Sequence, residues 1–199
     1  GADPICLAQV TVAAGSSFSA GGQLQGESVS GADWSSTISW ASDGGTPPAS
    51  GNAVVTTLAS STAGMTTYQL HAMLTAEQAN VYALAGTLDT LLVMPAAYQV
   101  AAPFGVDVGG VSPAFFPVNA DSEFDSWLTV GSVDGTAGAA LSTIGLNFDA
   151  WTADSGMTAN NGAVFWMDPG AGPTGADPIC LAQVTVAAGS SFSAGGQLQ

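Results

Sequence analysis

One segment of the chain occurs twice. Residues 1–25, GADPICLAQVTVAAGSSFSAGGQLQ, recur without a change as residues 175–199. A match of this length does not arise by chance, and two copies with separate histories would differ somewhere, so we interpret them as equivalent positions in a repeating array. The alternative is an engineered duplication that permutes the chain or swaps its strands.

The spacing of the copies predicts a domain organisation. Residue 175 repeats residue 1, which sets a period of 174 residues. This period is much longer than the about 20–50 residues of solenoid repeats, so each unit is large enough to fold by itself. We predict one repeat unit over 1–174 and the start of the next over 175–199. Within the unit we expect a strand-pair joint (1–25), a β-sandwich body (26–168) and a Pro/Gly linker (169–174).

Short apolar or alternating segments between Gly, Pro, Asn and Asp dominate the chain, and this pattern is typical of strands. It predicts an all-β fold, an antiparallel β-sandwich of about ten strands, jelly-roll-like in topology. Over 75–84, Thr75 and Gln78 are spaced as in a helix capping box. We expect a turn and then a strand there, because Gly86 and a Val-Tyr pair follow. The expected strands cover 6–12, 16–25, 36–42, 52–60, 66–74, 80–86, 90–100, 123–131, 141–148 and 162–168.

The two strands expected within 6–25 have two available roles. An exposed edge strand is prone to pair with other chains, and a tandem protein protects it with strands of the next unit. Alternatively, the two strands form the first hairpin of their own unit. Inter-unit contact is expected from apolar residues of both copies: Leu7, Val10, Val12, Phe18, Leu181, Val184, Val186 and Phe192.

The charge of the chain excludes several classes of partner. Lys and Arg number 0 against 15 Asp and Glu, which leaves a net charge of −15. Such a surface attracts neither a phosphate backbone nor an anionic membrane. Nucleic acid is therefore excluded as a partner, and membrane insertion is not expected. The expected partner is the chain itself, as a homopolymer or as tandem repeats, with glycans as a further candidate.

The densest group of carboxylates is DSEFD, followed by Asp134 in a DGTAG loop. If the first segment is a strand, Asp121, Glu123 and Asp125 lie on one face. Close carboxylates favour a cation, and hard oxygen ligands suit calcium. The sequence thus predicts weak calcium binding at these four residues and no other cofactor, with a solvated acidic face as the alternative.

Each period contains one cysteine, at Cys6 and again at Cys180. A disulfide within one unit is therefore excluded, and a bond between Cys6 and Cys180 requires sites one period apart to meet within about 7 Å at their Cα atoms. The fates we expect are a buried free thiol or a cross-link between neighbouring strands of an assembly. The loop SDGGTPPASG at 42–51 is a candidate for O-linked sugars, directly or after proline hydroxylation. The acceptors would be Thr46, Pro47, Pro48 and Ser50.

The sequence contains no recognisable catalytic constellation. His71 is the only histidine, and no GxSxG elbow is present. A pair of carboxylates for glycoside hydrolysis remains an alternative that nothing in the sequence selects. The tryptophans, which would line a sugar-binding face or fill the core, are Trp34, Trp40, Trp127, Trp151 and Trp166.

Four motifs carry a resemblance over about 94–169: MPAAYQVAAPFGVDVGG, DSEFDSWLTVG, LSTIGLNFDAWT and NGAVFWMDP. This region resembles an uncharacterised repeated β module of large secreted or surface proteins of algae and other protists. The resemblance implies an extracellular, repetitive and non-enzymatic setting.

Together these features predict a structural subunit of an extracellular filament or surface fibre, in which tandem β units are linked through the repeated terminal strands. An acidic surface without cations tolerates high salt, where mutual repulsion is screened. The first alternative is a carbohydrate-binding or adhesive module of a large surface protein. The second is a glycoside-active enzyme.

Overall fold

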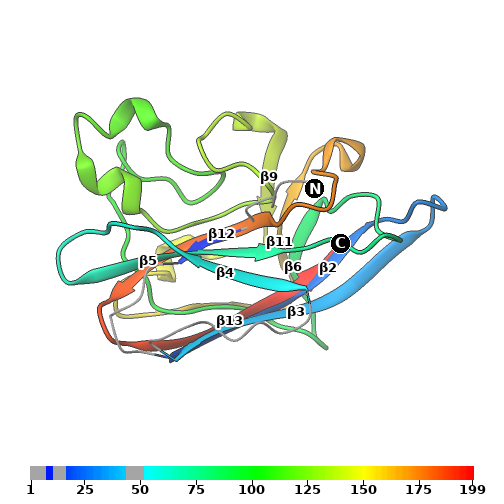
Figure 1. The fold of residues 1–199 in the computed structure, drawn as a ribbon, viewed down its shortest axis with the longest axis horizontal. Helices are drawn as coiled ribbons and strands as arrows, with labels where there is room; N and C mark the ends of the chain where they lie inside the picture. Colours follow the sequence, from blue (N-terminus) through cyan, green and yellow to red (C-terminus); the bar gives the residue numbers. More distant parts are fainter. Residues whose placement is uncertain (1–7, 11–16, 44–51) are drawn as a thin grey trace.

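The computed structural model describes residues 8–10, 17–43 and 52–199. They form two β-sheets packed face to face (Figure 1), so the prediction of an all-β sandwich is confirmed. The jelly-roll topology stays a prediction. The described residues contain no α-helix, and the turn at Thr75 to Gln78 followed by a strand is confirmed.

The smaller sheet, sheet A, has five strands. In spatial order they are β4 (Ala53–Thr57), β5 (Met65–Ala72), β1 (Ala8–Val10), β12 (Ile179–Ala187) and β8 (Trp127–Leu128). The larger sheet, sheet B, has eight strands. They are β10 (Met157–Ala159), β7 (Leu92–Met94), β13 (Ser191–Leu198), β3 (Asp33–Asp43), β2 (Ser17–Glu27), β6 (Ala83–Gly86), β11 (Gly162–Trp166) and β9 (Leu141–Ile144).

Large apolar side chains from both sheets fill the space between them. Tyr68 of β5 meets Phe192 of β13 edge to face, with ring centroids 5.7 Å apart. Trp40 of β3 is 1% exposed and its indole N–H donates to the carbonyl of His71 in β5 at 2.7 Å. The core is thus tied across the sandwich by aromatic packing and by one buried hydrogen bond.

The longest connection, between β7 and β8, is where the predicted strands differ most from the observed ones. The expected strand over 90–100 is only three residues long, Leu92–Met94, and ends before Pro95. The expected strand over 123–131 is a 3₁₀ helix, η2 (Ala120–Phe124), followed by the two-residue β8. The other 3₁₀ helices are η1 (Pro113–Phe115), η3 (Gly138–Ala140), η4 (Phe148–Ala150) and η5 (Pro169–Ala171).

Gly86 at the end of β6 allows a close approach of three segments. A Cβ there would lie 2.1 Å from the Ala159 carbonyl oxygen and 2.7 Å from the Leu92 nitrogen, both backbone atoms. We expect Gly86→Ala to cost about 2–3 kcal/mol, because β6 must separate from β7 and β10. Thermal denaturation would show this as a loss of about 5–10 °C in Tm.

A second glycine provides the control for this prediction. At Gly170 the nearest atom to an added Cβ is the flexible Asp168 carboxylate, 3.4 Å away. Gly170→Ala should therefore change stability by no more than about 0.5 kcal/mol. Equal Tm losses in the two variants would show that the tight contact at Gly86 is not what limits substitution.

Candidate functional site: the position shared by the two copies

The C-terminal copy contributes one strand to each sheet. β12 lies between β5 and β8 in sheet A, and β13 lies beside β3, β6 and β7 in sheet B. The turn between them is closed by a hydrogen bond from the Ser190 N–H to the Ala187 carbonyl oxygen. The expectation of a hairpin is therefore wrong for this copy, whose two strands pair with the body and belong to different sheets.

The N-terminal copy pairs with the same strands in the same registers. In sheet A, Val10 and Val184 are both partners of Tyr68. In sheet B, Ala20 and Ala194 both oppose Trp40. The pattern repeats on the far side of the strand, where Gly21 and Gly195 both oppose Val93 of β7, and Leu24 and Leu198 both oppose Leu84 of β6.

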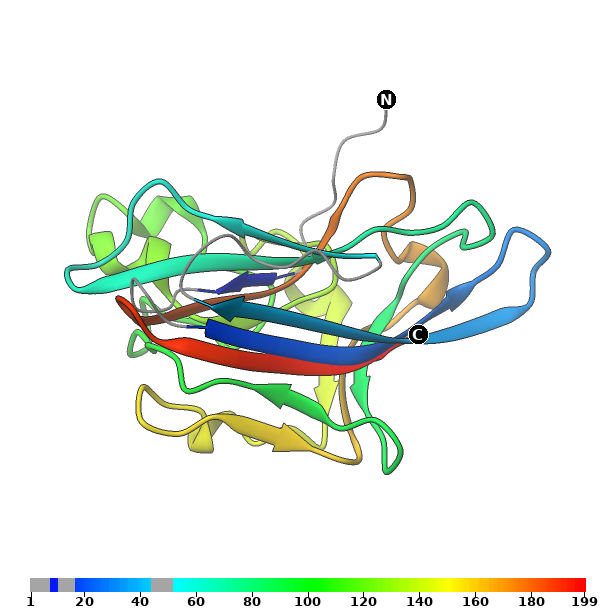
Figure 2. The same ribbon diagram turned by 60° about the horizontal axis from the view of Figure 1, so that its bottom comes forward.

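The copies also run parallel to each other in register. β2 pairs with β13 over eight residues, from Ser17 with Ser191 to Leu24 with Leu198, and β1 pairs with β12 at Ala8 with Ala182. Figure 2 shows β2 in blue and β13 in red running alongside each other. We call the two strand positions that the copies share the copy site. One position lies in sheet A between β5 and β8. The other lies in sheet B, with β3 on one side and β6 and β7 on the other.

The copy site is central in the sandwich, which corrects the idea that the repeated strands cover an edge. Residues Ile179 to Val186 of β12 are all buried. Of the predicted contact residues, Leu181, Val184, Val186 and Phe192 are at most 7% exposed. Val10 and Phe18 lie in β1 and β2, while Leu7 and Val12 lie outside the described residues. Each large apolar side chain buried this way contributes about 1.5–3 kcal/mol, so the body depends on a seated copy.

Polar contacts make the copy site specific for the sequence it holds. The Gln183 side-chain amide donates to the carbonyl oxygens of Glu123 at 2.9 Å and Asp125 at 2.7 Å. The Thr185 N–H donates to Ser126 Oγ at 2.8 Å, and its hydroxyl donates to the Phe124 carbonyl oxygen. Gln183 and Thr185 are both at most 1% exposed. A strand that lacks these two side chains would lose their hydrogen bonds to these three carbonyl oxygens.

The seated strands belong to the chain itself. Both copies pair with strands of this body, and pairing of the terminal strands with a neighbouring body stays a prediction. Cys180 is fully buried and disulfide-bonded, which removes the free-thiol alternative for it. Cys6 lies outside the described residues, as do the glycosylation candidates Thr46, Pro47, Pro48 and Ser50.

The four predicted calcium ligands do not form one cluster, although Glu123 and Asp134 line the same hollow. Because Asp121 and Glu123 lie in a 3₁₀ helix, alternation along a strand does not apply to them. Glu123 is exposed, whereas Asp134 accepts hydrogen bonds from the N–H and hydroxyl of Thr136 in its own loop. Within 8–10, 17–43 and 52–199 no three His, Cys, Asp or Glu residues are grouped so as to hold a metal ion.

Asp125 is turned inward and has a structural role. Its Oδ1 accepts from the Val100 N–H at 2.7 Å and its Oδ2 from the Val106 N–H at 2.6 Å, so the carboxylate holds both ends of one loop. Burial raises its pKa to about 7, although the hydrogen bonds from Val100, Val106 and Ser126 oppose this rise. With no exposed surface and both oxygens occupied, Asp125 is not placed to act on a substrate.

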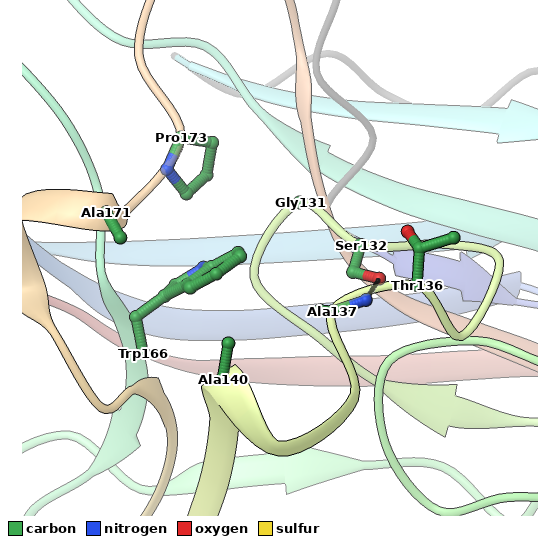
Figure 3. Close-up of a pocket in the computed structure, with 8 residues that line it drawn as sticks. All are labelled: Gly131, Ser132, Thr136, Ala137, Ala140, Trp166, Ala171 and Pro173. Atoms are coloured by element: carbon green, nitrogen blue, oxygen red, sulfur yellow. Dashed lines mark hydrogen bonds between the residues drawn. The ribbon is translucent and has the colours of Figure 1, made fainter.

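The five tryptophans divide between core and surface. Trp40, Trp127 and Trp151 are at most 2% exposed, whereas Trp34 and Trp166 are half-buried. Trp166 lines a hollow of about 430 Å³ together with Pro173 and other small residues (Figure 3). The hydroxyl groups lining this hollow are already bonded, Ser132 to the Gly109 carbonyl oxygen and Thr136 to Asp134.

Comparisons with known proteins add no assignment: no family model, curated protein or solved structure matches the chain. The described residues also include no helix with the length and apolar character needed to span a membrane. The sequence predicted that the repeated segments form strands that pair with a body. It contained no signal for which strands of the body flank them.

Proposed function

We propose that this chain is a non-enzymatic structural subunit of an extracellular filament or surface fibre, built from tandem β units that each contain one body and one seated copy. One observation carries the proposal: equivalent residues of the two copies pair with the same residues of β3, β5, β6 and β7. A body therefore takes one copy, and successive copies in an array would serve successive bodies.

The surface of the molecule supports this proposal. A net charge of −15 without any Lys or Arg keeps bodies from collapsing onto one another, and high salt outside the cell screens the repulsion within each body. The join between units, PGAGPTGADP, contains three prolines, which favour an extended connection over a compact one. The resemblance to surface proteins of algae and other protists points to the same setting.

A polypeptide of four consecutive 174-residue periods tests the proposal. We expect negative-stain images to show elongated particles whose length increases by a constant step with each added period, at low and high salt and with or without calcium. A single compact particle, or dispersed bodies without regular spacing, would contradict a structural role. The control is this 199-residue chain, which should give one body.

The second candidate function is carbohydrate binding, and the hollow at Trp166 is the observation that favours it. An indole ring at the surface provides a stacking face for a sugar, and Pro173 adds an apolar wall. If this is the function, Trp166→Ala should abolish binding on a glycan array while Trp34→Ala should leave it intact. We rank it second because the hydroxyl groups at the hollow are already bonded.

A further inference from the structure

We propose that the two copies are interchangeable: either one completes the body, and the surplus copy is a strand donor for the body of a second copy of this chain. This inference rests on the proposed function for its purpose, because an array needs its units to share strands in a defined way. It concerns which copy is seated, and not the shape of the assembly.

The sheet geometry allows only one seated copy at a time. Neighbouring strands lie about 4.8 Å apart, so two strands that flank one position leave room for one backbone. In sheet B that position has Trp40 of β3 on one side and Val93 of β7 on the other. Both copies meet these flanking residues with equivalent residues. The two copies, which also pair with each other in parallel, therefore compete for one position in the sheet.

Each copy reaches the copy site by a different connection. The N-terminal copy enters from the turn between β2 and β3, closed by a hydrogen bond from the Ser28 N–H to the Ala32 carbonyl oxygen at 2.7 Å. The C-terminal copy enters from the segment between β11 and β12, which carries η5. The two closed forms are circular permutants of one fold, and permutants of this kind are widely tolerated.

The contacts offered to the two copies are the same because their sequences are the same. The carbonyl oxygens of Glu123 and Asp125 that bind Gln183 would meet Gln9 in the same register, since Ala8 and Gln9 lie in register with Ala182 and Gln183. Neither copy has a side chain that the other lacks. The choice between them depends only on the two connections, which differ by loop-closure entropy.

Counting sites and copies identifies the partner. Residues 1–199 hold one copy site and two copies, so the copy that is not seated is left to pair with another body. This strand is apolar and identical in sequence to the seated one, so it can replace the seated copy in the body of a second chain. Insertion of a strand from one chain into the sheet of another is an established mode of association.

Paired substitutions in the full chain test interchange. Val184→Asp with Leu198→Asp blocks the C-terminal copy, because both side chains are fully buried and an unpaired carboxylate there is strongly unfavourable. The matched control, Val10→Asp with Leu24→Asp, blocks the N-terminal copy at the equivalent positions. A third variant carries all four substitutions. Cys180 is disulfide-bonded, so all samples contain a reductant to release a displaced copy.

We expect each pair of substitutions to leave a cooperative thermal transition within about 5 °C of the original chain, because the other copy takes the copy site. The four substitutions together should abolish the transition. If one pair of substitutions unfolds the chain and the other pair has no effect, the site belongs to one copy and the copies are not interchangeable. The proposal is also wrong if each pair by itself unfolds the chain, or if all three variants stay folded.

Donation to a second chain is tested with the four-substitution variant as acceptor. A synthetic peptide of residues 179–199 should restore its transition, and the same peptide with Val184→Asp should not. An equimolar original chain should also restore it and form a 1:1 complex in sedimentation. Rescue by the peptide but not by the chain would show that the surplus copy is not available, which overturns donation. Elongated four-period particles without interchange would refute this inference and leave the proposed function standing.

Discussion

Trp40→Ala is expected to remove about 3–5 kcal/mol from the free energy of unfolding, the range found for large aromatic truncations in a core. The ring is 1% exposed and crosses from β3 of sheet B to β5 of sheet A. Its loss leaves a cavity between the sheets and removes one hydrogen bond from the buried His71 carbonyl. Because domains of this size are stable by only about 5–15 kcal/mol, this is a large fraction of the total.

Two further variants separate the contributions to this loss. Trp40→Phe keeps most of the volume and loses the hydrogen bond to His71, so we expect about 1–2 kcal/mol. Trp34→Ala removes a half-buried tryptophan from the same strand and should cost clearly less than Trp40→Ala. Chemical denaturation measures all three. If Trp34→Ala costs as much as Trp40→Ala, the bridge between the sheets is not the source of the effect.

Two buried groups should give opposite pH dependences of stability. Burial lowers the pKa of His71 to about 3 from its usual 6.5, so the unfolded chain binds a proton that the folded chain does not as pH falls below 6.5. Acidification therefore destabilises the fold through His71. Burial raises the pKa of Asp125 to about 7 from its usual 3.8, so the folded chain binds the proton first. Acidification from pH 7 to 3.8 therefore stabilises the fold through Asp125.

Single substitutions separate the opposing slopes. Between pH 6.5 and 4.5 each group changes the stability by about 2–3 kcal/mol, at 1.4 kcal/mol per pH unit, and the two changes have opposite signs. His71→Gln should therefore gain stability on acidification, and Asp125→Asn should lose it. Denaturant unfolding at a series of pH values measures both. Exposed Asp154→Asn is the control, and parallel profiles in all four proteins would refute the prediction.

The local pattern of apolar and polar residues was sufficient to predict that the chain forms strands and to predict where several of these strands lie. The alternating segment at 36–42 lies within β3, and the segment at 66–74 largely matches β5. The same rule failed at 120–125, because Asp121, Glu123 and Asp125 alternate as in a strand while the backbone there forms a 3₁₀ helix. That helix covers β12 and is held by Gln183 and Thr185, which are far away in sequence. No local signal reports such a contact.

The identity of residues 1–25 and 175–199, the net charge of −15 and the all-β class follow from the amino-acid sequence alone, since each depends on composition, on self-comparison or on short-range periodicity. The position of the two copies in the sheets could be determined only from the tertiary structure. Strand neighbours are set by pairing between distant segments, and two identical segments carry identical pairing preferences. Only the registers with β3, β5, β6 and β7 show that both copies fit one position at the centre of the sandwich.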